Sequence, residues 1–198
     1  MKRGNDLGNL QDYVKLYDKI LDDQTCDDFL EIIKKANFER IESDLFKFKQ
    51  TIITDDMMWH LDDMEVDENE ASPLHIQDIF SGLFFSAATN YFQDTELPLV
   101  PELEGFENIR IKKFESGDFY KLHSDVNDYK SAKRFLSVMI FLENTDNCAI
   151  RFSNRSICDI TPVRGSILVF PPHWLFPYEV VCRDDATMMY AHSYLHYV

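Results

Sequence analysis

Two segments in the first half of the chain carry apolar residues at helical spacing. The first follows the polar stretch 22–25, where Asp23 or Thr25 can cap a helix. Its apolar face consists of Phe29, Leu30, Ile32, Ile33 and Ala36. The second has a longer face, made of Ile76, Ile79, Phe80, Leu83, Phe84, Ala87 and Tyr91. Because proline cannot continue a helix, we expect the second helix to end before the proline-containing stretch 97–101.

The other N-terminal residues predict extended chain and loops. Residues 1–12 are polar and predict a loose arm, and residues 13–21 predict a short strand or extended segment. Residues 55–73 are acidic and are interrupted by Ser72-Pro73, which indicates a loop. Within this loop the acidic run 65–70 is a candidate mobile lid.

Short runs of β-forming residues replace the helical pattern after about residue 107. They cover 109–114, 119–126, 135–142, 149–152, 157–163, 166–170, 178–182 and 187–197. Helices followed by a series of short strands predict an α+β fold that ends in an all-β barrel or sandwich. We expect a single domain over 1–198, with 1–106 as a helical collar and 107–198 as the β core.

Composition restricts the functional classes. The chain has 198 residues, with 20 basic and 35 acidic side chains and a net charge of −15. Nucleic acids and anionic membranes need a basic surface, so this charge argues against both as partners. The sequence has no apolar run of the roughly 18 residues that a membrane span needs, and no secretory signal. The four cysteines lack Cys-x-x-Cys spacing, which predicts free thiols in a reducing, cytoplasmic setting: Cys26, Cys148, Cys158 and Cys182.

A histidine and an aspartate two positions apart supply the first candidate chemistry. His123 and Asp125 follow Tyr120 in a predicted strand, where alternate side chains share a face. An imidazole and a carboxylate on one face are two of the three ligands in the facial triad of non-haem Fe(II) oxygenases. A surface histidine beside a solvated aspartate gives the same short pattern, so downstream residues must decide between the two readings.

The order of motifs around this pair resembles the prolyl 4-hydroxylase-like branch of the 2-oxoglutarate/Fe(II)-dependent dioxygenase superfamily. The Tyr-x-x-His-x-Asp motif at 120–125 is followed by a strand ending in Phe170-Pro171 and by a last strand at 187–197. Residues 17–22 and Cys26 match the N-terminal part of the family. The resemblance implies a double-stranded β-helix, or cupin-like jelly roll, with the N-terminal helices packed on one sheet.

Two positions depart from the family pattern. Tyr178 stands where the resemblance places the distal metal-binding histidine. Met188, ten residues later, stands where it places the Lys or Arg that binds 2-oxoglutarate. A thioether cannot neutralise a buried carboxylate, so 2-oxoglutarate is a doubtful cosubstrate unless another cation, such as Arg151 or Arg183, replaces the missing one. Fe(II) remains the metal that the resemblance implies.

His192 is our candidate for the third metal ligand. It alternates with Met188 on the interior face predicted for the last strand, beside the space that the resemblance gives to the cosubstrate. If that space is free, an imidazole can enter it, so we predict a metal site of His123, Asp125 and His192. The competing interpretation is a histidine that hydrogen-bonds within an aromatic interior.

Tyrosines offer further candidates. Tyr120 and Tyr178 are the candidate catalytic residues, and Tyr178 is the alternative third ligand as a phenolate, against an unperturbed pKa of about 10. A phenol hydrogen-bonded across the mouth of the barrel is the simpler role for Tyr178. His173 precedes the predicted strand that begins at Tyr178, and we expect the Pro171-Pro172 bend to direct its side chain along the rim of the barrel.

Two functions follow. The first is a non-haem Fe(II)-dependent oxygenase or hydroxylase with a non-standard metal site, acting on a small molecule or a peptide that the sequence does not specify. The alternative is a catalytically inactive dioxygenase-fold protein that serves as a binding or interaction module. The retained His123 and Asp125 favour the enzyme, whereas Tyr178 and Met188 favour loss of the standard reaction.

Overall fold

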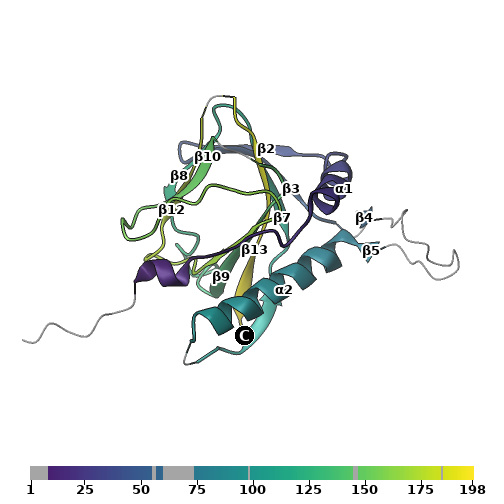
Figure 1. The fold of residues 1–198 in the computed structure, drawn as a ribbon. Helices are drawn as coiled ribbons and strands as arrows, with labels where there is room; N and C mark the ends of the chain where they lie inside the picture. Colours follow the sequence, from purple (N-terminus) through teal and green to yellow (C-terminus); the bar gives the residue numbers. More distant parts are fainter. Residues whose placement is uncertain (1–8, 55–56, 60–73, 98, 145–146, 184) are drawn as a thin grey trace, which may run out of the picture.

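The computed structural model describes all residues except 1–8, 55–56, 60–73, 98, 145–146 and 184 (Figure 1). The helical elements are η1 (Leu10–Tyr13), α1 (Asp23–Ile33) and α2 (Ile76–Asp94). The strands before α2 are β1 (Lys15–Tyr17), β2 (Glu39–Glu42), β3 (Phe46–Ile52), β4 (Met58–Trp59) and β5 (Leu74–His75). The strands after it are β6 (Leu103–Phe106), β7 (Arg110–Phe114), β8 (Phe119–His123), β9 (Arg134–Phe141), β10 (Cys148–Phe152), β11 (Ile167–Phe170), β12 (Tyr178–Cys182) and β13 (Met188–Tyr197).

A single antiparallel sheet curls on itself and encloses an interior (Figure 1). Its strand order is β1-β11-β9-β13-β7-β3-β8-β12-β10, with β2 paired to β3 and β6 paired to β13. A separate small pair, β4 and β5, precedes α2. The all-β barrel or sandwich expected from the sequence is therefore present as one continuous, curled antiparallel sheet.

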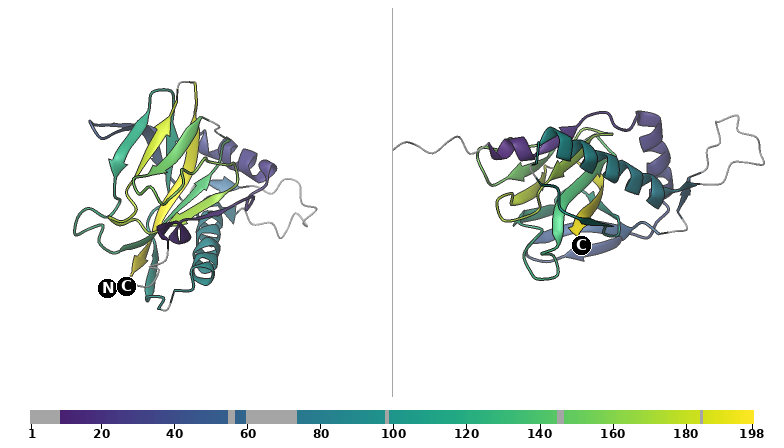
Figure 2. Two further views of the ribbon diagram at one scale, coloured as in Figure 1. Left: turned by 60° about the vertical axis from the view of Figure 1, so that its left-hand side comes forward. Right: turned by 90° about the horizontal axis from the view of Figure 1, so that it is seen from below.

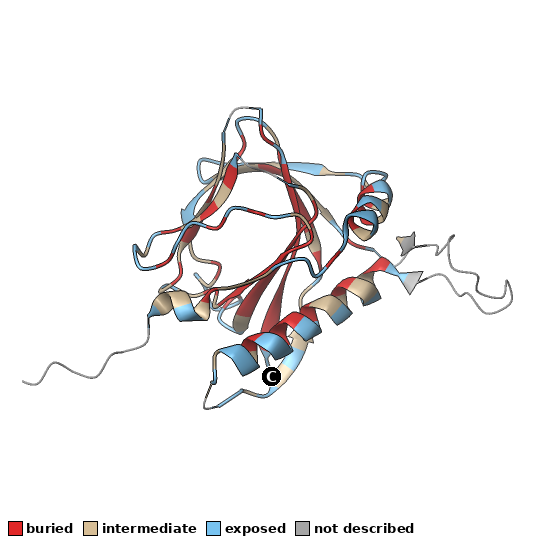
Figure 3. Cartoon of the chain, in the orientation of Figure 1, coloured by how far each residue is buried: buried red, intermediate tan, exposed pale blue. Residues whose placement is uncertain are grey.

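Side chains alternate between two cores along the central strands, as the period of two in a strand requires. Met188 and Tyr190 of β13 belong to the core inside the curl, while Met189 and Ala191 between them belong to the core on the outer face. Both cores are buried, and the red bands on the central strands in Figure 3 mark them. The interior that holds the candidate site is thus lined by one face of each strand.

Both helices cover the outer face of the sheet (Figure 2). Helix α2 packs with Phe80 and Phe84 fully buried, as its apolar periodicity predicts. Helix α1 begins one residue earlier than expected, because the Asp22 carboxylate accepts the hydrogen bond from the Thr25 backbone N–H at 2.8 Å. The N-cap is therefore Asp22, and the prediction of Asp23 or Thr25 is wrong.

Two sequence predictions of strands need correction. Residues 157–163 form no strand in the described structure; only Ile160 makes an isolated bridge to Ile150. The region assigned to a helical collar supplies β1, β2, β3 and β6 to the main sheet, and β3 pairs with both β7 and β8. The sheet therefore begins well before residue 107, although most of its strands follow that point.

The prediction of four free thiols is wrong for one pair. Cys148 and Cys182 lie opposite each other on β10 and β12 and form a disulfide. Cys26 is a free, buried thiol, and Cys158 is free and exposed. In the described part of the chain, neither helix is long and apolar enough to pass through a bilayer.

Candidate functional site

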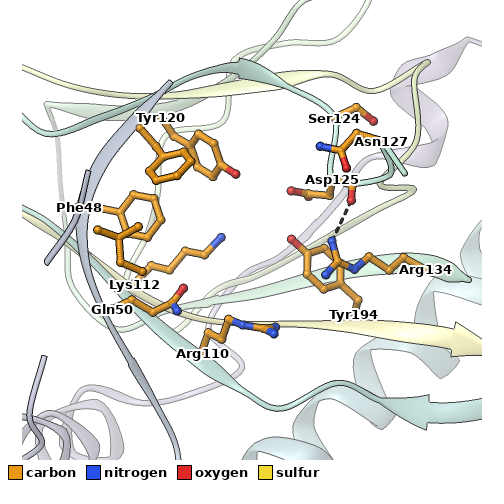
Figure 4. Close-up of a pocket in the computed structure, with 12 residues that line it drawn as sticks. Phe48, Gln50, Arg110, Lys112, Tyr120, Ser124, Asp125, Asn127, Arg134 and Tyr194 are labelled. Carbon is orange, nitrogen blue, oxygen red and sulfur yellow. Dashed lines mark hydrogen bonds between the residues drawn. The ribbon is translucent and has the colours of Figure 1, made fainter. Parts of the chain in front are cut away.

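A cavity of about 290 Å³ lies inside the curl of the sheet (Figure 4). It is lined by residues of β2, β3, β7, β8, β9 and β13 and of the loop after β8: Ile41, Phe46, Phe48, Gln50, Arg110, Lys112, Tyr120, Ser124, Asp125, Asn127, Arg134 and Tyr194. This volume is at the small end of ligand sites, which span roughly 300–1,000 Å³. Lys112 lies beside the rings of Phe48 and Tyr120, and Arg134 lies beside Tyr194 and Asp125 (Figure 4).

Backbone hydrogen bonds place Asp125 just beyond the end of β8. The Val126 N–H and the Ser124 hydroxyl both donate to the carbonyl oxygen of Pro172, at 3.1 and 3.0 Å. The Arg134 guanidinium donates to the Asp125 carbonyl oxygen at 2.8 Å (Figure 4). These contacts tie the turn to the loop that follows β11, so the Asp125 side chain points inward.

His123 and Asp125 converge as the sequence predicts. His123 Nε2 lies 3.3 Å from Asp125 Oδ1, and both side chains are largely buried. The His123 ring stacks on Tyr120 at a centroid distance of 3.5 Å, and its Nδ1 lies 2.9 Å from the Lys121 carbonyl oxygen. Burial alone would raise the pKa of Asp125, but the close approach of His123 and the surrounding positive charges outweigh it and hold that pKa below the usual range.

Tyr178 occupies the position opposite this pair. Strand pairing sets Tyr178 directly across from His123, and its ring centroid lies 4.4 Å from that of His123. The Tyr178 hydroxyl donates a hydrogen bond to Asp125 Oδ1 at 3.3 Å. Burial, followed by the nearby Asp125 charge, raises the pKa of Tyr178 well above 10, so the phenol stays protonated. The structure thus gives Tyr178 the role of a hydrogen-bonded phenol.

His192 is interior, as predicted, but its imidazole is engaged elsewhere. It is fully buried on β13, and its Nε2 shares a hydrogen bond with the Ser137 hydroxyl at 2.8 Å. Burial lowers the pKa of His192 well below 6.5, and the Lys112 charge lowers it further, so the ring is neutral. Its Nδ1 has no hydrogen-bond partner among the described residues.

A metal centre with three protein ligands is not formed by the described side chains. Among them, no group of three His, Cys, Asp or Glu side chains converges closely enough to hold a metal ion. His123 Nε2 and Asp125 Oδ2 are buried without a hydrogen-bond partner in this part of the chain, so two ligand atoms are available. The donor set present is one imidazole, one carboxylate and a protonated phenol, which falls one ligand short of a facial triad.

Lys112 is the residue that the sequence reasoning missed. It is 6% exposed, lies on β7 beside Tyr190 of β13, and points into the cavity (Figure 4). Burial lowers the pKa of Lys112 to about 8. The signal was available in retrospect: Lys112 alternates with the interior residue Phe114, so a period of two places it inside.

The other cations suggested in place of residue 188 lie outside the cavity. Arg151 is on β10 and pairs with Asp159 at 3.2 Å and with Glu179 at 3.8 Å. Arg183 is exposed beyond the end of β12. Met188 itself is fully buried in the interior core, as the family position predicts.

The remaining candidates fall at the rim or outside the described residues. His173 packs against the Phe176 ring at a centroid distance of 5.3 Å and does not line the cavity. The proposed lid, 65–70, and the acidic positions 62–63 lie outside the described residues.

No family model matches the chain, and no curated protein matches it in sequence. Solved structures do match its fold. A prolyl-4-hydroxylase from Pseudomonas putida aligns with a TM-score of 0.66 at 13% identity, covering 94% of this chain and 93% of that one. The viral collagen prolyl hydroxylase of Paramecium Bursaria Chlorella virus-1 aligns with a TM-score of 0.67 at 16% identity, covering 100% and 98%.

A further structural match contains a bound peptide. It is a prolyl hydroxylase from Trichoplax adhaerens in complex with a hypoxia inducible factor oxygen degradation domain fragment, with a TM-score of 0.65 at 13% identity, covering 93% of this chain and 84% of that one. At these identities the likeness establishes fold. The resemblance read from the sequence motifs is thus confirmed, and the chain has the fold of the prolyl 4-hydroxylase-like branch of the 2-oxoglutarate/Fe(II) oxygenases.

Proposed function

We propose that the curled sheet is a double-stranded β-helix whose interior serves as a binding chamber for a small molecule. The single observation that carries this proposal is the hydrogen bond from the Tyr178 hydroxyl to Asp125 Oδ1. A protonated phenol at the family's distal ligand position donates to one oxygen of this carboxylate without a metal ion. The chamber itself is retained, with a volume of about 290 Å³ and polar groups directed into it.

Ligand binding in the presence of a chelator tests this function. We expect small molecules to raise the melting temperature of the wild-type chain in EDTA, and Gln50→Trp, which fills the chamber from β3, to abolish the shift. Gln24→Trp, at an exposed position on α1, is the matched control and should retain it. Binding that requires added metal, or that survives Gln50→Trp, would contradict the proposal.

A metal-dependent oxygenase is the second candidate, and one observation favours it. Each of the three residues predicted to hold the metal has one buried polar atom without a hydrogen-bond partner among the described residues: His123 Nε2, Asp125 Oδ2 and His192 Nδ1. In this candidate His123 and Asp125 would hold Fe(II), and His192 would complete the site through its free Nδ1. Bound iron would supply the activation of dioxygen, and Tyr120, stacked on His123, would fix the ring of the first ligand.

Metal affinity separates the two candidates. If the second holds, wild-type protein retains one equivalent of metal, His123→Ala abolishes retention, and His192→Ala weakens it by roughly 10- to 1,000-fold. In both cases we propose a small molecule or a peptide as the bound species.

A further inference from the structure

A buried cation without a counter-ion lies in the wall of the chamber. Lys112 is 6% exposed, and its ammonium makes no hydrogen bond or ion pair with any described residue. Its Nζ instead sits among three aromatic rings, 5.6 Å from the centroid of Phe48, 5.4 Å from that of Tyr120 and 6.0 Å from that of Tyr190. Aromatic faces attract a cation, but they do not replace the hydrogen bonds that an ammonium loses on burial.

The other charges of the chamber are already matched. Arg134 and Arg110 both pair with Glu107, at 2.7 and 3.0 Å. Asp125 is engaged by His123 and by the Tyr178 hydroxyl, and it forms no ion pair with Lys112. Lys112 is therefore the cation of the described chamber wall that still lacks an anionic partner.

A second unpartnered donor lies next to Lys112. Tyr190 is paired with Lys112 across β13 and β7, so both side chains leave the sheet on the interior face. The Tyr190 hydroxyl is buried and has no hydrogen-bond partner among the described residues. An ammonium and a phenol O–H on the same face of neighbouring strands are donors suited to a single anionic group, although of the two only Lys112 lines the cavity.

We propose that Lys112 anchors the acidic group of a small organic anion, a carboxylate or a phosphate, inside the chamber. This inference rests on the proposed binding function and specifies its ligand class. The cation that is absent at Met188 of β13 is supplied from the neighbouring strand β7, where Lys112 lies two residues before Phe114, the strand partner of Met188. The cavity volume of about 290 Å³ is suited to a small ligand.

Calorimetry at neutral pH with matched probes tests the anchor. The probes are glutarate, its uncharged diamide glutaramide, and inorganic phosphate, each titrated in EDTA into wild-type protein, Lys112→Met and Lys113→Met. Lys113 is the control because it lies one position away on β7 and pairs with Glu115 at 3.0 Å outside the chamber. Removing an unpaired buried charge leaves the fold intact, and circular dichroism of Lys112→Met verifies this.

We expect at least one of the two acids to bind wild-type protein and Lys113→Met equally, and to lose about tenfold or more in affinity in Lys112→Met. Binding of glutarate alone identifies a carboxylate, and binding of phosphate alone identifies a phosphate. Equal binding of an acid to Lys112→Met, or binding of glutaramide as tight as glutarate, would overturn the anchor while leaving the chamber as a binding site. Failure of all three probes to bind wild-type protein would overturn both the anchor and the proposed function.

Discussion

In the function that we propose, Tyr178 stands in place of a third protein ligand to iron. Its phenol hydrogen-bonds to Asp125 at 3.3 Å and lies across from His123, so these two side chains face a neutral donor. Sequence alone places Tyr178 correctly, because the motif spacing fixes its position. The hydrogen bond and the raised pKa that define its role depend on burial, which a spacing does not give.

For His192 the sequence predicts the face of the strand but not the hydrogen-bond partner of the imidazole. Period-two alternation correctly predicts that it points into the interior on β13. Its hydrogen bond goes to Ser137 of the adjacent strand β9, a register partner of Tyr194, and this pairing could not be read from the sequence. The prediction that His192 completes a metal site stays a prediction.

Lys112 should make stability rise with pH. Its folded pKa of about 8 is below the unfolded value of 10.5, so the unfolded chain binds more protons between these two pH values. The free energy of unfolding contributed by Lys112 therefore increases from about pH 8 to 10.5, by about 3 kcal/mol. Denaturant unfolding at several pH values measures the free energy of unfolding of wild-type protein and of Lys112→Met. The difference between the two free energies should become smaller from about pH 8 to pH 10.5. A difference that is constant with pH would contradict the lowered pKa.

Glu107 should make the stability of the fold fall in acid. Burial raises its pKa, but hydrogen bonds from Arg134 and His196 outweigh burial and lower it to about 2. A depressed pKa stabilises the fold above the unfolded value of about 4.5, and this contribution is lost as pH falls toward 2.

Glu107→Gln is accordingly expected to lower the melting temperature at pH 7. The difference in melting temperature from wild-type protein should become smaller as the pH is lowered. Glu104→Gln is the matched control, because Glu104 pairs with Lys133 at the surface, where an ion pair contributes little. Equal effects of the two substitutions at pH 7 would contradict a structural role for the Glu107 network.

At the scale of elements, alternation predicts the central strands and fails at the periphery. β9, β11 and β13 are rich in apolar residues and buried on both faces, so their existence follows from the pattern. Residues 157–163 contain Asp159 and Pro162 and lie beside β10 with only the bridge at Ile160. Strand β3 was missed although Phe46 and Phe48 alternate with lysines, the pattern of a half-buried strand, and its pairing with β2, β7 and β8 completes the sheet.

The pairing of β10 with β12 is reinforced by the Cys148–Cys182 disulfide. The two cysteines are 34 positions apart, and a cross-link that closes such a loop contributes typically 2–4 kcal/mol. We expect reductant to lower the melting temperature of wild-type protein, and the double substitution Cys148→Ala/Cys182→Ala to start lower and respond no further. Cys158→Ala, at an exposed free thiol, should behave as wild type. An unchanged melting temperature on reduction would show that the bridge does not stabilise the sheet.

On the scale of the whole molecule, the fold class was accessible from the sequence and the chemistry only in part. The helical periodicity of α2 and the motif order from Tyr120 to β13 predict the architecture that the prolyl hydroxylase structures share. His123 and Asp125 converge as predicted. The charge inside the barrel was not predicted, because the sequence comparison looked for a cation on β13 and the structure has Lys112 on β7.

The central claim is that Tyr178 replaces a metal ligand with a hydrogen-bond donor, so that the barrel functions as a binding chamber. Anaerobic titration of Fe(II) into metal-free wild-type protein and Tyr178→His tests it most directly, with His123→Ala/Tyr178→His as the control that removes the first ligand. The account predicts weak, non-stoichiometric binding by wild-type protein and a gain of about 10- to 100-fold in affinity with Tyr178→His, lost again in the control. Stoichiometric, tight binding by wild-type protein that Tyr178→His leaves unchanged would contradict it.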